Sequence, residues 1–171
     1  MAQHIYNANF VHCIFSTKER KNTIPAELQG PLWAYLLGIA NHLKMKSLAI
    51  GGTENHVHLL LGVPPTITIA EAVQKLKANS SRWMGEHGID FPWQEGYGAF
   101  SVSPSLLEIV QQYIRNQKEH HRKRGFEEEF RTILKKSGVA YDAESFFAAW
   151  CRPLGDSVCL ASRLPGTHVP G

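Results

Sequence analysis

Cysteine is scarce in this sequence of 171 residues, which contains three cysteines in all. Cys13 stands alone near the N-terminus, and Cys151 and Cys159 lie far from it, near the C-terminus. Because the number is odd and no CxxC pair is present, the pattern indicates neither a disulfide framework nor a zinc ribbon. Reduced thiols of this kind are typical of proteins that remain in the cytoplasm.

Long apolar runs are also missing. No stretch approaches the roughly 18 to 20 apolar residues that a membrane-spanning helix needs. The first residues, Met1 to His4, do not form a basic region followed by an apolar run, so we expect no secretory signal peptide. Together these absences predict a cytoplasmic protein without a membrane partner.

The composition that is present fits one folded domain. Hydrophobic residues make up 43% and charged residues 19%, which excludes a disordered or fibrous chain. The formal net charge of +3 permits a polyanionic partner and does not prove one. Nine histidines are a high count for this length, and only their positions can say what they do.

The spacing of apolar residues predicts an α+β fold. In order, it indicates a strand over residues 5–16, a helix over about 23–44, strands over 46–52 and 56–63, a helix over about 69–84 and a strand over 96–103. The order β-α-β-β-α-β is that of ferredoxin-like, RRM-like domains. We expect an antiparallel sheet with two helices on one face and the other face free for a ligand.

Further helices are predicted after this unit, over residues 105 to about 121, 126–136 and, more weakly, 143–150. The last residues, 151–171, contain Pro153, Pro165 and Pro170 and are expected to be an irregular tail. We therefore predict one domain over residues 1–150, followed by that tail.

Two histidines lie on the best predicted strand. Since side chains alternate along a strand, His56 and His58 face one side, and Val57, Leu59 and Leu61 face the two helices. Two imidazoles side by side suit a metal site. On this pair alone, two surface histidines on an open sheet are an equally acceptable interpretation.

Tyr113 and Gln117 are four residues apart on a predicted helix and so share one face. Alone, they would be a tyrosine at the edge of the core and a solvated glutamine. With the histidines, they suggest a cation bound by two imidazoles and an amide oxygen, and a phenol that attacks a phosphate. Free phenol has a pKa near 10, so a cation that neutralises phosphate charge would assist. The ligand types suit Mg²⁺ or Mn²⁺ and also permit zinc.

Basic residues cluster after Tyr113, where residues 115–124 contain five Lys or Arg and one Glu. Such a stripe can follow a phosphate backbone, although cations at a helix end are also favoured by the helix dipole. The candidate DNA contacts are Lys18, Arg20, Lys77, Arg82, Arg115, Lys118, Arg122 and Lys123. Trp93 and Phe100, in a segment rich in aromatics and glycine, either stack unpaired bases or close the core.

Several motifs, taken in order, resemble a known family. They are STKER at 16–20, ENHVHLL at 54–60, WQEGYGAFSVS at 93–103, YIRNQKEHH at 113–121 and FEEEF at 126–130. The chain resembles the IS200/IS605-type transposases, which are single-tyrosine HUH nucleases, including relatives associated with repetitive extragenic palindromes. The resemblance extends over about residues 4 to 142, and the segment after Trp150 does not take part in it.

The resemblance implies roles for individual residues. His56 and His58 are the expected metal ligands, Gln117 the third ligand and Tyr113 the nucleophile, with Mg²⁺ or Mn²⁺ as the cation. From their position in the basic stretch after Tyr113, His120 and His121 are expected to contact DNA or to lie behind the ligands, and the remaining histidines, including His12, receive no role.

The family also implies an activity and partners. Its members cut single-stranded DNA near imperfect hairpins, form a 5′-phosphotyrosine link and rejoin strands, as homodimers with shared active sites. We therefore expect a nucleoid-associated transposase of a bacterial or archaeal cell. A non-catalytic, domesticated protein that binds DNA hairpins is the alternative, and a phosphodiesterase that uses water in place of Tyr113 is a third.

Overall fold

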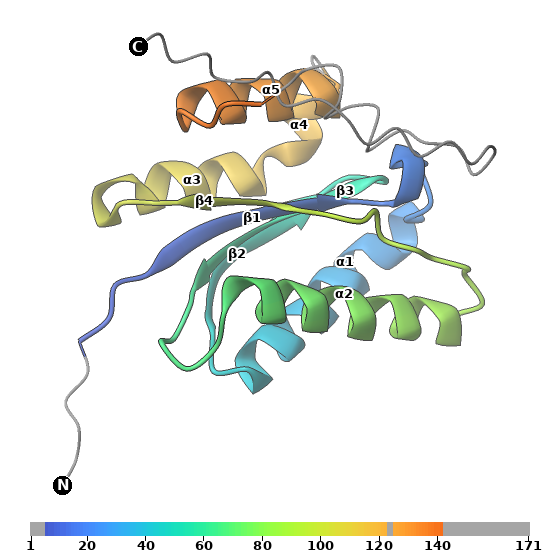
Figure 1. Ribbon diagram of the computed structural model, residues 1–171. Helices are drawn as coiled ribbons and strands as arrows, with labels where there is room; N and C mark the ends of the chain where they lie inside the picture. The colour runs from blue at the N-terminus through green and yellow to red at the C-terminus, as the bar shows by residue number, and fades with distance from the viewer. Residues whose placement is uncertain (1–5, 123–124, 142–171) are drawn as a thin grey trace, which may run out of the picture.

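Helices cover both faces of a four-stranded sheet in the computed structural model, which describes residues 6–122 and 125–141 (Figure 1). The spatial order is β2-β3-β1-β4 and all neighbouring strands are antiparallel. The strands are β1 (Phe10–Ser16), β2 (Lys46–Gly52), β3 (His56–Gly62) and β4 (Gly98–Ser101). With a helix between β1 and β2 and another between β3 and β4, this confirms the predicted ferredoxin-like α+β arrangement.

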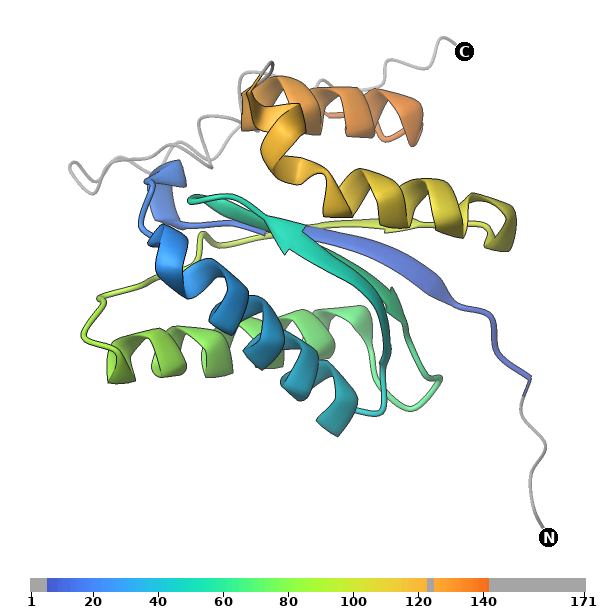
Figure 2. The same cartoon turned by 180° about the vertical axis from the view of Figure 1, so that it is seen from behind.

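Helices α1 (Ala26–His42) and α2 (Ile69–Glu86) cover one face of the sheet, as Figure 2 shows from behind. Val57, Leu59 and Leu61 point into the core between them, in agreement with the alternation read from the sequence. Helix α2 begins at a capping residue, because the Thr68 side chain accepts a hydrogen bond from the Glu71 amide at 3.2 Å. The largest apolar cluster therefore lies on the side of β3 away from the two histidines.

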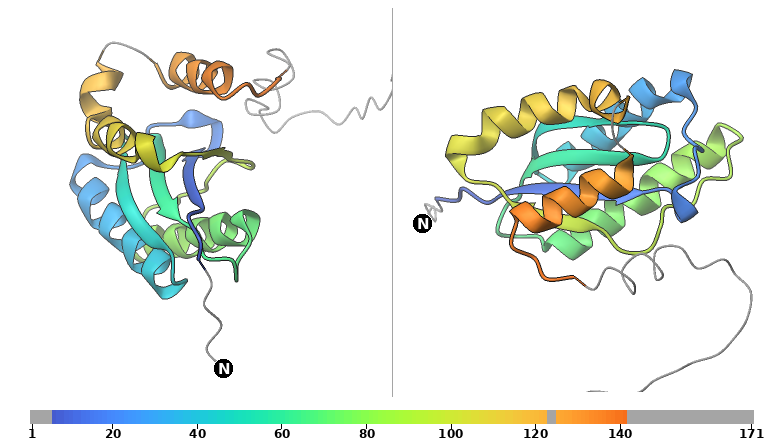
Figure 3. Two further views of the ribbon diagram at one scale, coloured as in Figure 1. Left: turned by 90° about the vertical axis from the view of Figure 1, so that its left-hand side faces the viewer. Right: turned by 90° about the horizontal axis from the view of Figure 1, so that it is seen from above.

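The opposite face is also covered, so the prediction of a free face is wrong. Helices α3 (Leu107–Arg115), α4 (Gln117–His121) and α5 (Phe126–Lys136) lie over it (Figure 3). The reason is that this face carries apolar residues of its own. Leu60 packs with Ile114 of α3, and Ile14 packs with Phe126 and Phe130 of α5. His56 and His58 are consequently fully buried.

The predicted helix over 105–121 is interrupted. It starts as a 3₁₀ turn, η2 (Pro104–Leu106), continues as α3, and breaks at Asn116, where φ and ψ are −95° and 17°. Helix α4 then begins at Gln117, whose side chain is buried. The break turns the chain back over the sheet and places α5 above β1 and β4, where Phe126 and Phe130 pack with Ile14 and Phe100.

Close contact between α3 and the sheet depends on a glycine. A Cβ atom built on Gly51 of β2 would collide with the backbone carbonyl oxygen of Ile114. Only a residue without a side chain lets the helix approach this strand so closely. Since Tyr113 directly precedes Ile114, Gly51 helps to determine how near the tyrosine lies to the sheet.

Some predicted boundaries differ from the structure. Residues 6–9 are irregular, and the Asn7 side chain donates a hydrogen bond to the Val63 carbonyl at 2.7 Å. Gly96 has a φ of 77°, which no strand permits, so β4 begins only at Gly98. The predicted helix over 143–150 and the tail over 151–171 lie outside the described residues. Among the described helices, none is both long and apolar enough to cross a membrane.

Candidate active site

His56 presents its Nε2 atom to the space between the sheet and helices α4 and α5. Its Nδ1 atom lies 2.7 Å from Asn55 Oδ1 and 3.0 Å from Thr53 Oγ1. The Asn55 amide nitrogen donates to Asn22 Oδ1 at 2.9 Å, so the Asn55 oxygen must face His56. Nδ1 therefore carries the hydrogen of the neutral ring, and Nε2 retains a lone pair. Burial lowers the pKa of His56 well below its usual range, with His58 and His121 adding to the effect.

His58 contacts His12 through its Nδ1 atom, and His12 is a residue to which the sequence pattern assigns no role. His12 Nε2 and His58 Nδ1 lie 2.9 Å apart, and the two rings stack with centroids 5.1 Å apart. Burial, with His58 nearby, lowers the pKa of His12 to about 3, so its ring is neutral. His58 Nε2 is buried and has no hydrogen-bond partner. We assign the shared hydrogen to His58 Nδ1, which leaves Nε2 with a lone pair.

Gln117 is oriented by a carboxylate. Its Nε2 atom donates to Glu129 Oε1 at 2.9 Å, so its Oε1 atom faces His56 Nε2 at 3.4 Å. Both of these facing atoms offer lone pairs and neither has a hydrogen to share. Such a contact between buried acceptors is unfavourable unless a cation lies between them.

Tyr113 lies beside the histidines of its own chain. Its ring is 5.9 Å from that of His58 and 6.2 Å from that of His12, centroid to centroid, both edge to face. Its hydroxyl donates a hydrogen bond to Glu129. Burial raises the pKa of Tyr113 above its usual range, and the negative charge of Glu129 raises it further. The phenol is therefore neutral in this arrangement.

Glu129 of α5 lies at the centre of the site, and sequence reasoning missed it. Besides Tyr113 and Gln117 it accepts a hydrogen bond from His121 Nε2 at 2.7 Å. Burial alone would raise the pKa of Glu129, but the hydrogen bonds that it accepts from His121 and Tyr113 outweigh this and hold the pKa well below the usual range. The sequence feature that could have identified it is its helical spacing with Phe126, Phe130 and Leu134. A carboxylate on the buried face of a helix needs hydrogen-bond or charged partners.

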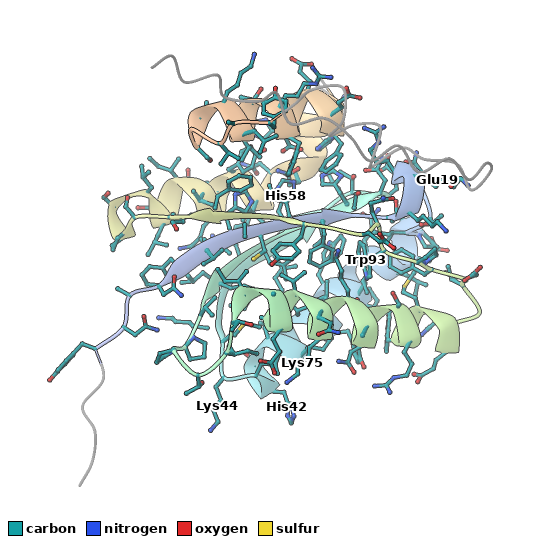
Figure 4. The ribbon with its side chains drawn as sticks, viewed as in Figure 1. Glu19, His42, Lys44, His58, Lys75 and Trp93 are labelled. Atoms are coloured by element: carbon teal, nitrogen blue, oxygen red, sulfur yellow. The ribbon has the colours of Figure 1, made fainter. Side chains whose placement is uncertain are left out.

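The predicted ligands and the predicted nucleophile thus converge from three elements. His56 and His58 come from β3, Gln117 from α4 and Tyr113 from α3, with Glu129 added from α5. Figure 4 shows His58 between the sheet and these helices, and Trp93 on the opposite side of the sheet. Trp93 and Phe100 are both buried, so these two aromatics belong to the core. A cavity of about 520 Å³ opens beside Tyr113, between α3 and α5, and Val110, Ile109 and Ile133 line its apolar side.

The predicted DNA-binding residues that the structure describes lie in three places. Arg115 of α3, Lys118 of α4 and Arg122, which follows α4, are exposed and lie near Gln117 along the chain. Arg82 is exposed on α2, across the sheet from the site. Lys77 also lies there, and it donates to the carbonyl oxygens of Gln94, at 2.8 Å, and Gly96.

Two more of these residues lie in the short 3₁₀ turn η1 (Lys18–Arg20). Arg20 pairs with Glu127 of α5 at 3.3 Å, which ties this turn to the helix that carries Glu129. Lys18 is half-buried in the same turn. Lys123 lies outside the described residues.

Comparisons with known proteins point to one family. The sequence profile described as "Transposase IS200 like" matches residues 5–117. The transposases for insertion sequence element IS200 of Salmonella typhimurium and Salmonella typhi are each 25% identical over 116 residues, which cover 63% of this chain and 76% of theirs.

Two solved structures are similar. A crystal structure from Deinococcus radiodurans R1, described as that of a candidate transposase, is 30% identical, with a TM-score of 0.54 over 68% of this chain and 95% of its own. A REP-associated tyrosine transposase bound to a REP hairpin is 11% identical, with a TM-score of 0.54 over 71% of this chain and 73% of its own. At that identity the second likeness concerns the fold alone.

Proposed function

Because the chain belongs to the family of IS200-like transposases, we propose that it cuts and rejoins single-stranded DNA through Tyr113, with a divalent cation held by His56, His58 and Gln117. The observation that carries this proposal is the position of the Tyr113 ring, 5.9 Å from that of His58 in the same chain. A transposase acts on DNA ends, and a tyrosine beside a metal site is suited to transfer of a phosphodiester.

The donor atoms fit a divalent cation. Two imidazoles and an amide oxygen direct donor atoms into one buried space, and His58 Nε2 has no hydrogen-bond partner there. Nitrogen and oxygen donors of this kind suit Mn²⁺ well and Mg²⁺ less well. When bound, such a cation would neutralise charge on the phosphate and stabilise the departing oxygen.

The chain's own groups would then position and activate the nucleophile. Tyr113 Oη would attack the phosphorus, the bond from phosphorus to the 3′ oxygen would break, and a 5′-phosphotyrosine would form. The hydroxyl proton, which Tyr113 donates in a hydrogen bond to Glu129, must be released, and the departing 3′ oxygen must take up a proton to become the free 3′-OH. The covalent link conserves the energy of the phosphodiester, so a free 3′-OH can later reverse the reaction.

We further propose that the substrate is single-stranded DNA that contains a hairpin. Support comes from the exposed cations Arg115, Lys118 and Arg122 beside Gln117, and from the similar tyrosine transposase that was solved with a REP hairpin. Contacts of Lys and Arg with phosphates make such binding weaken steeply with salt.

An assay with hairpin DNA separates this function from its alternatives. The protein is incubated with single-stranded hairpin DNA and Mn²⁺ or Mg²⁺ and then run on a denaturing gel. We expect a covalent protein–DNA band that is absent for Tyr113→Phe. Cleavage that survives this substitution would indicate hydrolysis by water, and binding without cleavage would indicate a hairpin-binding protein.

A further inference from the structure

Glu129 lies within 4 Å of every proposed catalytic or metal-binding side chain of the site. It is the only carboxylate among residues 6–122 and 125–141 that lies with histidines in a group suited to a metal, together with His56 and His121. The donor atoms of these three residues lie within 4.8 Å of one another. The residue comes from α5, an element that contributes none of the predicted ligands.

The two oxygen atoms of Glu129 face different partners. Oε1 accepts hydrogen bonds from the Tyr113 hydroxyl and from Gln117 Nε2. Oε2 accepts from His121 Nε2 at 2.7 Å and lies 3.6 Å from His58 Nε2 and 3.8 Å from His56 Nε2. One oxygen therefore faces the nucleophile, and the other faces the histidines of β3.

The contacts of Oε2 with these two histidines are not ordinary ion pairs. The hydrogen of His56 is on Nδ1, held by Asn55, and that of His58 is assigned to Nδ1, held by His12. Both Nε2 atoms therefore direct lone pairs toward Oε2, at distances longer than a hydrogen bond. Three lone pairs that converge in a buried space repel one another without a cation to share.

We propose that Glu129 is a further, negatively charged ligand of the divalent cation, and that it also positions the Tyr113 hydroxyl beside that cation. This rests on the proposed function, because the cation is the one that His56, His58 and Gln117 hold. His121 orients the carboxylate through its hydrogen bond. One oxygen of the carboxylate would bind the cation, and the other accepts the hydrogen bond of the Tyr113 hydroxyl. Helix α5 would thus add a fourth ligand to those supplied by β3 and α4.

Calorimetric titration of the full chain with MnCl₂, without DNA, tests the ligand role. We expect Glu129→Gln to weaken Mn²⁺ binding at least tenfold, whereas Glu128→Gln, an exposed neighbour on the same helix, binds as the wild type does. The amide oxygen that Glu129→Gln introduces can still accept from Tyr113, and circular dichroism establishes that the variant is folded. Wild-type affinity in a folded Glu129→Gln would overturn the proposal.

The results that would contradict the proposed function differ from those that would contradict the role of Glu129. If the wild type forms no covalent DNA link with any divalent cation, the proposed function fails. If the wild type forms the link and binds Mn²⁺ while Glu129→Gln binds it equally well, only the role of Glu129 fails.

A second comparison tests the positioning role. At high Mn²⁺ the covalent yield of Glu129→Gln should recover to within a few fold of wild type, because an amide oxygen still receives the Tyr113 hydroxyl. Glu129→Ala lacks any acceptor there, and its yield should stay at least tenfold lower at the same Mn²⁺ occupancy, measured by titration. Equal recovery of the two variants would contradict the positioning role.

Discussion

Tyr113 donates its hydroxyl hydrogen to Glu129, a residue sixteen positions later on a different helix. This bond joins α3 to α5 on the face of the sheet toward which His58 points (Figure 4). The relationship is non-local, and it determines which groups the phenol meets.

His12 is expected to orient His58 for metal binding. Removing its ring in His12→Ala takes away the partner of His58 Nδ1, and the loss of such a supporting hydrogen bond weakens metal sites by about 10- to 100-fold. His12→Gln supplies an amide oxygen as an acceptor and should lose less. Titration with Mn²⁺ measures both variants, and a His12→Ala protein with wild-type affinity would exclude this role.

Gly51 is expected to be required for the docking of α3. In Gly51→Ala the new methyl group collides with the Ile114 carbonyl, and the resulting overpacking should cost about 1–3 kcal/mol of stability. The covalent yield should fall as well, because Tyr113 adjoins Ile114. Gly85→Ala in α2 is the matched control, since its methyl group meets nothing within 4 Å, and it should stabilise the helix slightly. Denaturant unfolding measures both, and equal stabilities would disprove the contact.

Lys77 should make stability increase with pH in the alkaline range. Burial lowers the pKa of Lys77 to about 8 from an ordinary 10.5. Between these values the unfolded chain binds more protons than the folded one, so the free energy of unfolding rises with pH. Because Lys77 is partly exposed, we expect it to contribute a gain of only about 1 kcal/mol between pH 8 and 9.5, measured relative to Lys77→Met, since buried Cys13, whose pKa is raised to about 12, acts in the opposite direction. Lys77→Met should remove this gain and Lys75→Met should keep it; a gain that persists in Lys77→Met would refute the assignment.

Each chain is expected to use its own tyrosine. The resemblance implies homodimers with shared active sites, yet Tyr113 lies beside His58 within one chain. Mixing Tyr113→Phe with His56→Ala should therefore restore no covalent DNA link, whichever way the subunits pair. Recovery to about a quarter or more of wild-type yield would mean that the tyrosine acts on the partner's histidines.

Much of the fold could be predicted because its signals are local. Period-two alternation over residues 56–63 identified β3 and the shared direction of His56 and His58. The same alternation puts Leu60 beside His58, and the apolar character of that face explains why helices cover it. The sequence offered no Gly or Pro at Asn116, so the break between α3 and α4 was not predictable from turn chemistry.

The site was only partly predictable for a different reason. Tyr113 and Gln117 are close in sequence, and His56 and His58 are adjacent on one face. His12 and Glu129 reach the same space through strand pairing and through the packing of α5, which no spacing rule describes. Glu129 was recognisable only as a carboxylate within a buried stripe, and His12 as one polar residue in an apolar strand.

The most direct test is the mass of the protein–DNA adduct after proteolysis. Hairpin DNA and Mn²⁺ are incubated with the full chain, the adduct is digested, and the modified peptide is sequenced by mass spectrometry. We predict a 5′-phosphonucleotide attached to Tyr113, with a free 3′-OH on the released strand, and no adduct with His56→Ala. An adduct on another residue, or cleaved DNA without any adduct, would contradict the account.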